Sequence, residues 1–363
     1  MTRETAPERS TEGMVDYDAN SRAQKQNALH NSDVIFDLAN RAATKSHPLN
    51  ITDYGCGPGQ SSIETVRPAL KAWSSLPHNN QSVCHADQPG NDWNALMGLI
   101  YGDSGYANEA DAPLVRTSVG SFYERMMPDN SVTIATCFFA SHWLSQSVRL
   151  YAPETIWFAD LTGEARRKMW QLAESDWVNF LNLRAQELQP GGYLFVSALG
   201  AVPQEGEING IAAAGRGNYR AQQAVVASMV EDGELDRDAA DNFVFGLWFL
   251  TADEARQAIE RNDELSKLYE IDTIEAEYVD DGGDLFLDCL SDPSEYARRY
   301  SGYTRAYAGT TLRRNLFEPS AGRGRTADEI EAEFFRRFEA LYAEKTNKYA
   351  CEQWHLKAIL KRI

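Results

Sequence analysis

The chain is poor in positive charge relative to negative charge. Its 363 residues include 35 lysines and arginines against 53 aspartates and glutamates, so the formal net charge is −18. Proteins that bind a nucleic-acid backbone normally rely on clustered Lys and Arg, and this balance therefore argues against a nucleic-acid partner. An acidic surface also keeps a protein soluble, so the charge by itself assigns no function.

Cysteine is scarce and scattered. The five cysteines are Cys56, Cys84, Cys137, Cys289 and Cys351, without any C-x-x-C pair or close cluster of His and Cys. This spacing argues against a structural zinc site, and no residue is assigned to a metal. We expect reduced thiols in the core.

Long apolar runs are also lacking. The first twelve residues are polar, and no apolar stretch approaches the roughly 20 residues that a membrane span needs. The sequence therefore predicts a cytoplasmic protein with no membrane partner. Hydrophobic residues nevertheless make up 43% of the chain, which is enough for a substantial core.

The most informative segment is an apolar strand that leads into an acid and alternating glycines, at residues 49–59. Its key positions are Asp53, Gly55, Gly57 and Gly59. Such glycines let the backbone turn sharply and approach a ligand, and the following helix offers free N–H groups. In dinucleotide sites the acid comes about 20 residues after the glycines. Here the acid precedes them, an order similar to the S-adenosylmethionine (SAM) loop of class I methyltransferases.

Four further blocks accompany this loop. They read YDANSRAQ (17–24), HADQPGNDWN (85–94), GSFY (120–123) and FASHWLSQ (139–146). The second block places an acid, Asp87, at the end of a short strand, where a ribose diol can be bound. In order and spacing the five blocks resemble the SABATH family of carboxyl and nitrogen methyltransferases.

This resemblance implies roles for individual residues. The residues that would hold SAM are Ser21, Asp53, Gly55, Gly57, Gly59, Asp87, Gln88, Ser121 and Phe122. Gln24 and Trp143 would hold the substrate carboxylate. The substrate pocket would include Tyr17, Phe139, His142 and Tyr219.

Three positions depart from the family pattern. Ser61 stands where many members have asparagine, Gln88 replaces an apolar residue, and His142 replaces a methionine beside the carboxylate tryptophan. The first two departures are compatible with SAM binding, whereas the third leaves the substrate class open.

The chemistry of methyl transfer fits these residues. The methyl group of SAM is already activated, so the protein must mainly hold an acceptor in line with it, at about 3 to 3.5 Å. A carboxylic acid is ionised at pH 7 and needs no general base. The Gln24 amide and the Trp143 indole are neutral donors that can orient a carboxylate without drawing off its charge. The sequence thus predicts a SAM-dependent carboxyl methyltransferase that produces S-adenosylhomocysteine (SAH) and the methyl ester of a small, partly apolar acid.

Three alternatives stay open at this point. His142 could accept a proton from a heterocyclic N–H or a phenol, which would make the enzyme an N- or phenolic O-methyltransferase. An NAD(P)-dependent oxidoreductase would explain the glycine loop, but it predicts a different glycine spacing and a catalytic set that we cannot assign. A non-catalytic protein of the same fold would bind the ligand without turnover.

Helical and strand patterns alternate along the chain, which predicts an α/β fold. With the resemblance, we expect a Rossmann-like class I methyltransferase sheet with helices on both faces and an α-helical cap. The expected elements are a helix at 34–43 and strands at 82–86, 132–137, 193–199, 269–279 and 354–363. Pro68 should kink or shorten the helix after the glycine loop. Pro190-Gly191-Gly192 should form a helix-to-strand turn, and residues 206–217 a loop.

We divide the chain into three parts. Residues 1–16 are expected to be mobile. Residues 17–200, 250–290 and 330–363 should form the SAM-binding core, and residues 201–249 and 291–329 the cap over the substrate pocket. A homodimer is common among the proteins that the chain resembles, but the sequence does not define the oligomeric state.

Overall fold

A seven-stranded sheet forms the centre of the computed structural model, which describes residues 22–43, 48–76, 81–108, 112–278, 284–322, 324–345 and 347–363. Its strand order is β3-β2-β1-β4-β5-β9-β8. The first five strands are parallel, whereas β9 runs antiparallel to both β5 and β8. The strands are β1 (Leu49–Tyr54), β2 (Gln81–Asp87), β3 (Leu114–Val119), β4 (Val132–Phe138), β5 (Leu188–Leu199), β8 (Tyr269–Tyr278) and β9 (Trp354–Arg362).

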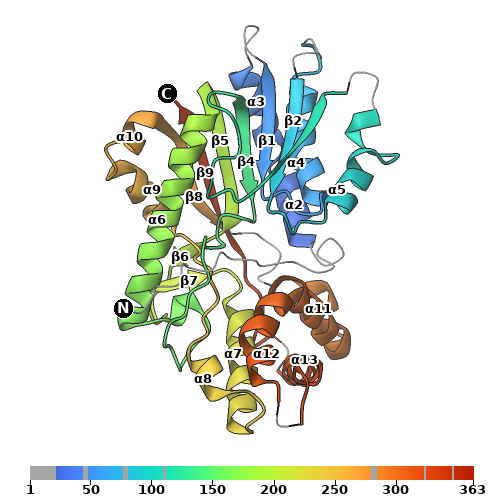
Figure 1. Ribbon diagram of the computed structural model, residues 1–363, viewed down its shortest axis with the longest axis vertical. Coiled ribbons are helices and arrows are strands. Elements are labelled where there is room, and N and C mark those ends of the chain that lie inside the picture. The colour runs from blue at the N-terminus through green and yellow to red at the C-terminus, as the bar shows by residue number, and fades with distance from the viewer. Residues whose placement is uncertain are drawn as a thin grey trace, which may run out of the picture.

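Helices cover both faces of this sheet (Figure 1). One face carries α2 (Arg22–His30), α3 (Ser32–Ala42), α4 (Gln60–Ala72) and α5 (Trp93–Ile100). The other face carries α6 (Gly163–Glu187), α9 (Ala252–Glu260) and α10 (Leu265–Leu268).

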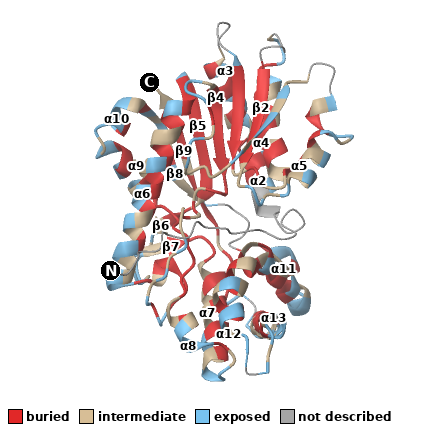
Figure 2. Ribbon diagram, viewed as in Figure 1, coloured by how far each residue is buried: buried red, intermediate tan, exposed pale blue. Residues whose placement is uncertain are grey.

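The side chains of the central strands alternate between two apolar clusters, because successive residues of a strand point to opposite faces. Ile134 and Phe195 belong to the cluster under α3 and α4, while Ala135 and Val196 belong to the cluster under α6. With both faces covered, every residue of β1 and β4 is buried (Figure 2). This burial fits the mainly apolar sequence of β4.

A second group of helices lies beyond the carboxyl ends of the parallel strands (Figure 1). It contains α7 (Arg216–Glu231), α8 (Arg237–Asp241), α11 (Pro293–Leu312), α12 (Glu318–Ser320) and α13 (Ala327–Glu344), and the short hairpin β6 (Ala201–Pro203) and β7 (Ile211–Ala213) lies beside it. Because α13 packs against α11 and α7, residues 327–344 belong with the cap helices. The sequence interpretation had assigned residues from 330 onward to the core. The other boundaries of the division stay a prediction, and residues 1–16 lie outside the described part of the chain.

The expected helix at 34–43 and the expected strands are present, and the α/β architecture is confirmed. One local expectation stays open in part, and two are wrong. Pro68 does not shorten helix α4, which continues to Ala72 with Val66 and Ala69 packed on its apolar side, while a kink at Pro68 stays a prediction. The Pro190–Gly192 stretch lies inside β5 as an irregularity in its pairing with β4. Residues 206–217 contain β7 and the start of α7 as well as loops.

All five cysteines are free and buried, as the sequence analysis expected. Within the described ranges, no helix has both the length and the apolar character needed to cross a membrane.

Candidate functional site

The glycine loop joins β1 to α4 at the carboxyl edge of the sheet. Gly55, Gly57 and Gly59 have φ angles of 80°, 56° and 117°, in the region that glycine enters without a steric penalty. Gly55 is closely packed, since a Cβ there would lie 2.3 Å from the Cβ of Ala140. At Gly57 a Cβ would meet no atom of the described residues within 4 Å. The loop therefore offers open backbone at Gly57, which fits a ligand that approaches the chain closely.

Asp87 at the end of β2 ties this loop to the neighbouring strand. Its Oδ2 accepts a hydrogen bond from the N–H of Gly57 at 2.7 Å, and its Oδ1 accepts one from the N–H of Gln88 at 2.7 Å. Asn91, which sequence reasoning did not identify, donates from Nδ2 to the carbonyl of Gly57 at 2.8 Å. The carboxylate and the amide together fix the conformation of the loop.

Ser121 and Phe122 follow β3, in a segment that lies next to Asp87 and the glycine loop. The N–H of Gly120 donates to the carbonyl of Asp87 at 2.9 Å, and the Phe122 ring lies 3.8 Å from the position of a Cβ on Gly55. The structure thus brings together the predicted cofactor residues from Asp53 to Phe122. Ser21 lies outside the described residues.

Asp53 is a buried carboxyl, only 4% exposed. Thr136 Oγ1 donates to its Oδ1 at 2.7 Å, and Ser62 provides a second hydrogen bond. Burial raises the pKa of Asp53 to about 7, and the nearby charge of Asp87 adds to the rise. Burial also raises the pKa of Asp87. Two carboxyls that resist ionisation next to each other favour a cationic ligand, and the sulfonium and ammonium groups of SAM fit that requirement.

We expect SAM to bind more tightly as the pH rises through 7. The free protein holds a proton on Asp53 below a pH of about 7, whereas a bound cation favours the ionised carboxylate. Isothermal titration should give a dissociation constant about tenfold lower at pH 8 than at pH 6. The Asp53→Asn variant should bind weakly at both pH values, and a full pH response in this variant would count against the role of Asp53.

The same pKa shift affects the stability of the ligand-free protein in the opposite direction. Because the pKa of Asp53 is raised from 3.8 to about 7 on folding, the folded chain holds a proton that the unfolded chain releases. The contribution of this group to stability therefore falls as the pH rises through that window.

Substitution of Gly57 by alanine should weaken SAH binding more than about tenfold. The new methyl group would enter the open space at the loop, where we expect the ligand to lie. The matched control is Gly210→Ala, because Gly210 has a φ of 67° and a Cβ there would also meet nothing within 4 Å in the described part of the chain. Both variants carry a similar backbone cost of about 1–2 kcal/mol, so titration with SAH and thermal unfolding separate ligand contact from strain. Equal SAH affinities for the two variants would show that no ligand approaches Gly57.

Trp143 lies in the segment after β4. The backbone N–H of Trp143 donates to the carbonyl of Ala140 at 3.0 Å, and the backbone N–H of the next residue, Leu144, donates to the carbonyl of Gly246 at 2.8 Å. The indole Nε1 of Trp143 is buried and has no hydrogen-bond partner among the described residues. A buried donor without an acceptor costs about 1–3 kcal/mol, which a ligand that accepts from it would relieve.

Gln24 lies in α2, and its side chain is outside the described residues, as is the whole of Tyr17. The helix itself is fixed at the carboxyl end of β5. Asn27, one turn after Gln24, accepts through Oδ1 a hydrogen bond from Ser197 Oγ at 3.0 Å. The backbone of Gln24 is therefore held near the edge of the sheet where the glycine loop begins.

The predicted pocket residues Phe139, His142 and Tyr219 are joined by Phe249, which the sequence analysis did not identify. Ring centroids are 6.5 Å apart for Phe139 and His142, 5.1 Å for His142 and Phe249, and 6.4 Å for Phe249 and Tyr219. Phe139 has a φ of 53°, which is uncommon for a residue other than glycine. Its N–H donates to the carbonyl of Ser197 at 2.8 Å. These rings form one aromatic wall beside Trp143.

His142 is buried, and its Nδ1 has no hydrogen-bond partner in the described ranges. Burial lowers the pKa of His142 to about 3, and the neighbouring His355 contributes to this shift. His355 comes from β9, and its ring lies 4.8 Å from that of Phe139. No sequence signal identified His355 or Phe249, because both lie in the half of the chain where the resemblance is loose.

The cap closes this region from the other side. A small pocket lies between the ends of β5 and β9 and the helices α7 and α11. Its lining includes Leu199, Asn218, Tyr219, Tyr303, Tyr307 and Gln353. Tyr219 therefore borders both the aromatic wall and the cap.

The parallel sheet with an antiparallel β9, the glycine loop after β1 and the acids that end β1 and β2 define a class I methyltransferase. The chain belongs to the SAM-dependent carboxyl methyltransferase family, whose sequence profile matches residues 5–363. SAM is accordingly its methyl donor.

Several named proteins are similar to this chain. Gibberellic acid methyltransferase 2 of Arabidopsis thaliana is 24% identical over 320 residues, which cover 78% of this chain and 79% of that protein. Indole-3-acetate O-methyltransferase 1 of Oryza sativa subsp. japonica is 24% identical over 336 residues, which cover 83% of this chain and 81% of that protein. Probable caffeine synthase 2 of Camellia sinensis is 26% identical over 231 residues, which cover 59% of this chain and 62% of that protein.

A solved structure of loganic acid methyltransferase with SAH has the same fold. It matches with a TM-score of 0.73 at 20% identity, and the match covers 97% of this chain and 98% of that one. The similarity extends over the sheet and the cap helices together.

Proposed function

We propose that this protein methylates the carboxylate of a small, partly apolar acid and releases the methyl ester and SAH. The observation that carries the proposal is the buried indole N–H of Trp143, which lacks an acceptor among the described residues and lies beside aromatic rings. A carboxylate oxygen would satisfy this donor, and the rings suit the apolar part of an acid.

In this proposal the cofactor residues act by holding and orienting. Asp87 accepts hydrogen bonds from the ribose hydroxyls, Asp53 faces the cationic part of the donor, and Phe122 lies against the adenine. Ser21, Gln88, Ser121 and the glycine loop complete the site. When bound, SAM supplies a methyl group that is already activated.

On the acceptor side, Gln24 and Trp143 each orient one carboxylate oxygen. Tyr17, Phe139 and Tyr219 pack against the remainder of the acid. The carboxylate is ionised at pH 7, so no side chain has to remove a proton. The residues of this pocket therefore have only to position the acceptor and exclude water.

The properties of His142 support a carboxylate acceptor over an N–H or phenol acceptor. A general base works best with a pKa near the working pH, whereas the pKa of His142 is lowered to about 3. His142 is thus a weak proton acceptor. Two of the similar proteins are named for acids, gibberellic acid and indole-3-acetate, which supports the same choice.

Methyl transfer from labelled SAM to a panel of acids tests the proposal. The panel contains benzoate, salicylate, indole-acetate, cinnamate and terpenoid acids, and each product is treated with alkali. Label released as methanol identifies a methyl ester and ranks the acids. Label that resists alkali would overturn carboxyl methylation and favour the N- or phenolic O-methyl alternative. A cytoplasmic location and a homodimer stay predictions, and light scattering tests the dimer.

A further inference from the structure

A fully buried ion pair lies at the carboxyl end of α6. Arg184 Nε donates to Glu187 Oε2 at 2.8 Å and Arg184 Nη2 to Glu187 Oε1 at 3.0 Å, and both side chains are 0% exposed. Removing two charges from water costs several kcal/mol each, so a pair of this kind contributes little net stability by comparison with apolar side chains. Its value therefore lies in the geometry that it fixes.

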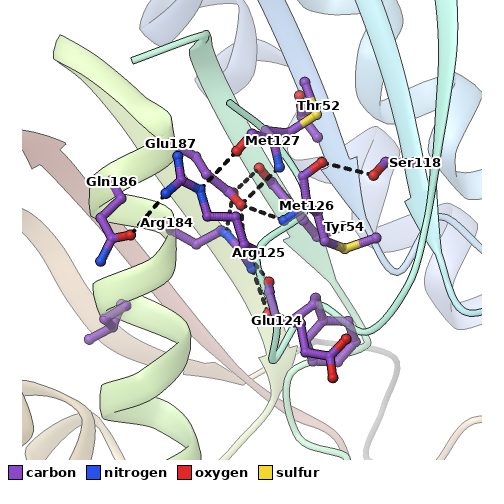
Figure 3. A network of polar contacts seen from close by, with 12 residues as sticks. Thr52, Tyr54, Ser118, Glu124, Arg125, Met126, Met127, Arg184, Gln186 and Glu187 are labelled. Atoms are coloured by element: carbon purple, nitrogen blue, oxygen red, sulfur yellow. Dashed lines mark hydrogen bonds and ion pairs between the residues drawn. The ribbon is translucent and has the colours of Figure 1, made fainter. Parts of the chain in front are cut away.

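The ion pair holds the backbone of residues 122–127, which lie outside any helix or strand (Figure 3). Arg184 donates to the carbonyls of Phe122 at 2.6 Å and Glu124 at 3.1 Å. Glu187 Oε1 accepts from the N–H groups of Met126 at 2.7 Å and Met127 at 3.0 Å. One pair of side chains thus satisfies four backbone groups of a single loop.

The same pair reaches the glycine loop through Tyr54, the residue between Asp53 and Gly55. Tyr54 Oη donates to Glu187 Oε2 at 2.6 Å, and the Arg184 guanidinium lies over the Tyr54 ring at 4.2 Å from its centroid (Figure 3). Burial raises the pKa of Tyr54 well above its usual value, so the phenol keeps its proton and stays a donor. The Glu187 carboxylate therefore joins two segments that meet at the predicted cofactor site, residues 122–127 and the end of β1 at Tyr54.

We infer that Arg184 and Glu187 are positioning residues for the methyl donor. They set the distance between the segment that carries Ser121 and Phe122 and the loop that begins at Gly55, without contact with the ligand themselves. The inference rests on the proposed function, because it assumes that Ser121 and Phe122 bind the adenosine part of SAM.

The Arg184→Lys variant tests this inference. Lysine keeps the positive charge but lacks the planar fork, so it cannot serve Glu187 and the two carbonyls together. We expect the dissociation constant of SAH and the KM for SAM to rise about tenfold, with kcat at saturating SAM within about twofold of the parent value. Hydrogen exchange of peptides that cover 121–127 should become faster.

The matched control is Asp284→Asn, at a second buried polar cluster. Asp284 is 4% exposed, and its carboxylate accepts from the hydroxyls of Tyr296 and Tyr300 at 2.6 Å each, with Tyr296 and Tyr300 both in α11. This control should lower Tm but leave SAH affinity unchanged. An unchanged SAH affinity in Arg184→Lys, or an equal loss in Asp284→Asn, would overturn the inference.

Two further variants keep the result interpretable. If Arg184→Lys does not fold, Tyr54→Phe removes only one hydrogen bond to Glu187 and should weaken SAH binding about threefold; full affinity there would count against the inference. Phe122→Ala examines the underlying assignment. Unchanged SAH affinity in Phe122→Ala would refute the proposed role of Phe122, whatever the result at Arg184.

Discussion

Replacement of Asp87 by alanine should weaken SAH binding about 100-fold, while kcat at saturating SAM falls much less. Hydrogen bonds from the ribose hydroxyls to a carboxylate are worth about 1.5–3 kcal/mol each. The variant also removes the acceptor for the N–H of Gly57, which now holds the loop at 2.7 Å. Titration with SAH and steady-state kinetics with varied SAM give the two quantities.

Asp92→Ala is the control for this variant. Asp92 lies five residues after Asp87, and its side chain is exposed. It caps α5 by accepting a hydrogen bond from the N–H of Ala95 at 2.9 Å. Loss of that cap should cost about 1 kcal/mol of stability and leave SAH binding as it is. Wild-type affinity in Asp87→Ala would refute the assignment of the ribose site.

The Trp143→Phe variant should lower kcat/KM for the acid about 100-fold and leave SAH affinity unchanged. Phenylalanine preserves most of the aromatic contact but removes the indole N–H, and a hydrogen bond to a charged group is worth about 1.5–3 kcal/mol. Since the N–H would orient the attacking carboxylate, we expect losses in both kcat and KM. The measurement uses the best acid of the panel.

Trp170→Phe provides the comparison. Trp170 is half-buried on α6 and packs against Trp248 at 5.2 Å between ring centroids. Trp170→Phe is therefore the same change of side chain at a tryptophan that has no assigned role in holding the acid. Its kcat/KM should stay within about twofold of the parent value. An equal loss of SAH affinity and acid turnover in Trp143→Phe would mean that the indole supports the fold and not the acceptor.

The clustering of the candidate cofactor residues was predictable because these residues lie in short blocks next to strand ends. A parallel sheet brings the carboxyl ends of neighbouring strands to one edge, so Asp53 and Asp87 had to lie close together once β1 and β2 were recognised. The fold followed from the same alternation of strands and helices. The π-helical turn at Arg313–Phe317 had no comparable signal.

The tertiary contacts that hold the candidate site in place were not predictable from the sequence. Tyr54 and Glu187 are 133 residues apart in sequence, and their hydrogen bond depends on how α6 packs across the sheet. Phe249 and His355 likewise contact His142 and Phe139 through tertiary packing, which single-sequence periodicity does not encode.

The buried cysteine thiols can be used to detect local unfolding of the sheet and of the cap. Burial raises the pKa of Cys84, Cys137 and Cys351 to about 12, and only the thiolate attacks a disulfide reagent. Labelling therefore waits for local unfolding. Cys84 and Cys137 lie in the sheet, whereas Cys351 lines the pocket under the cap. The order in which these thiols react will rank the opening of the cap against that of the sheet.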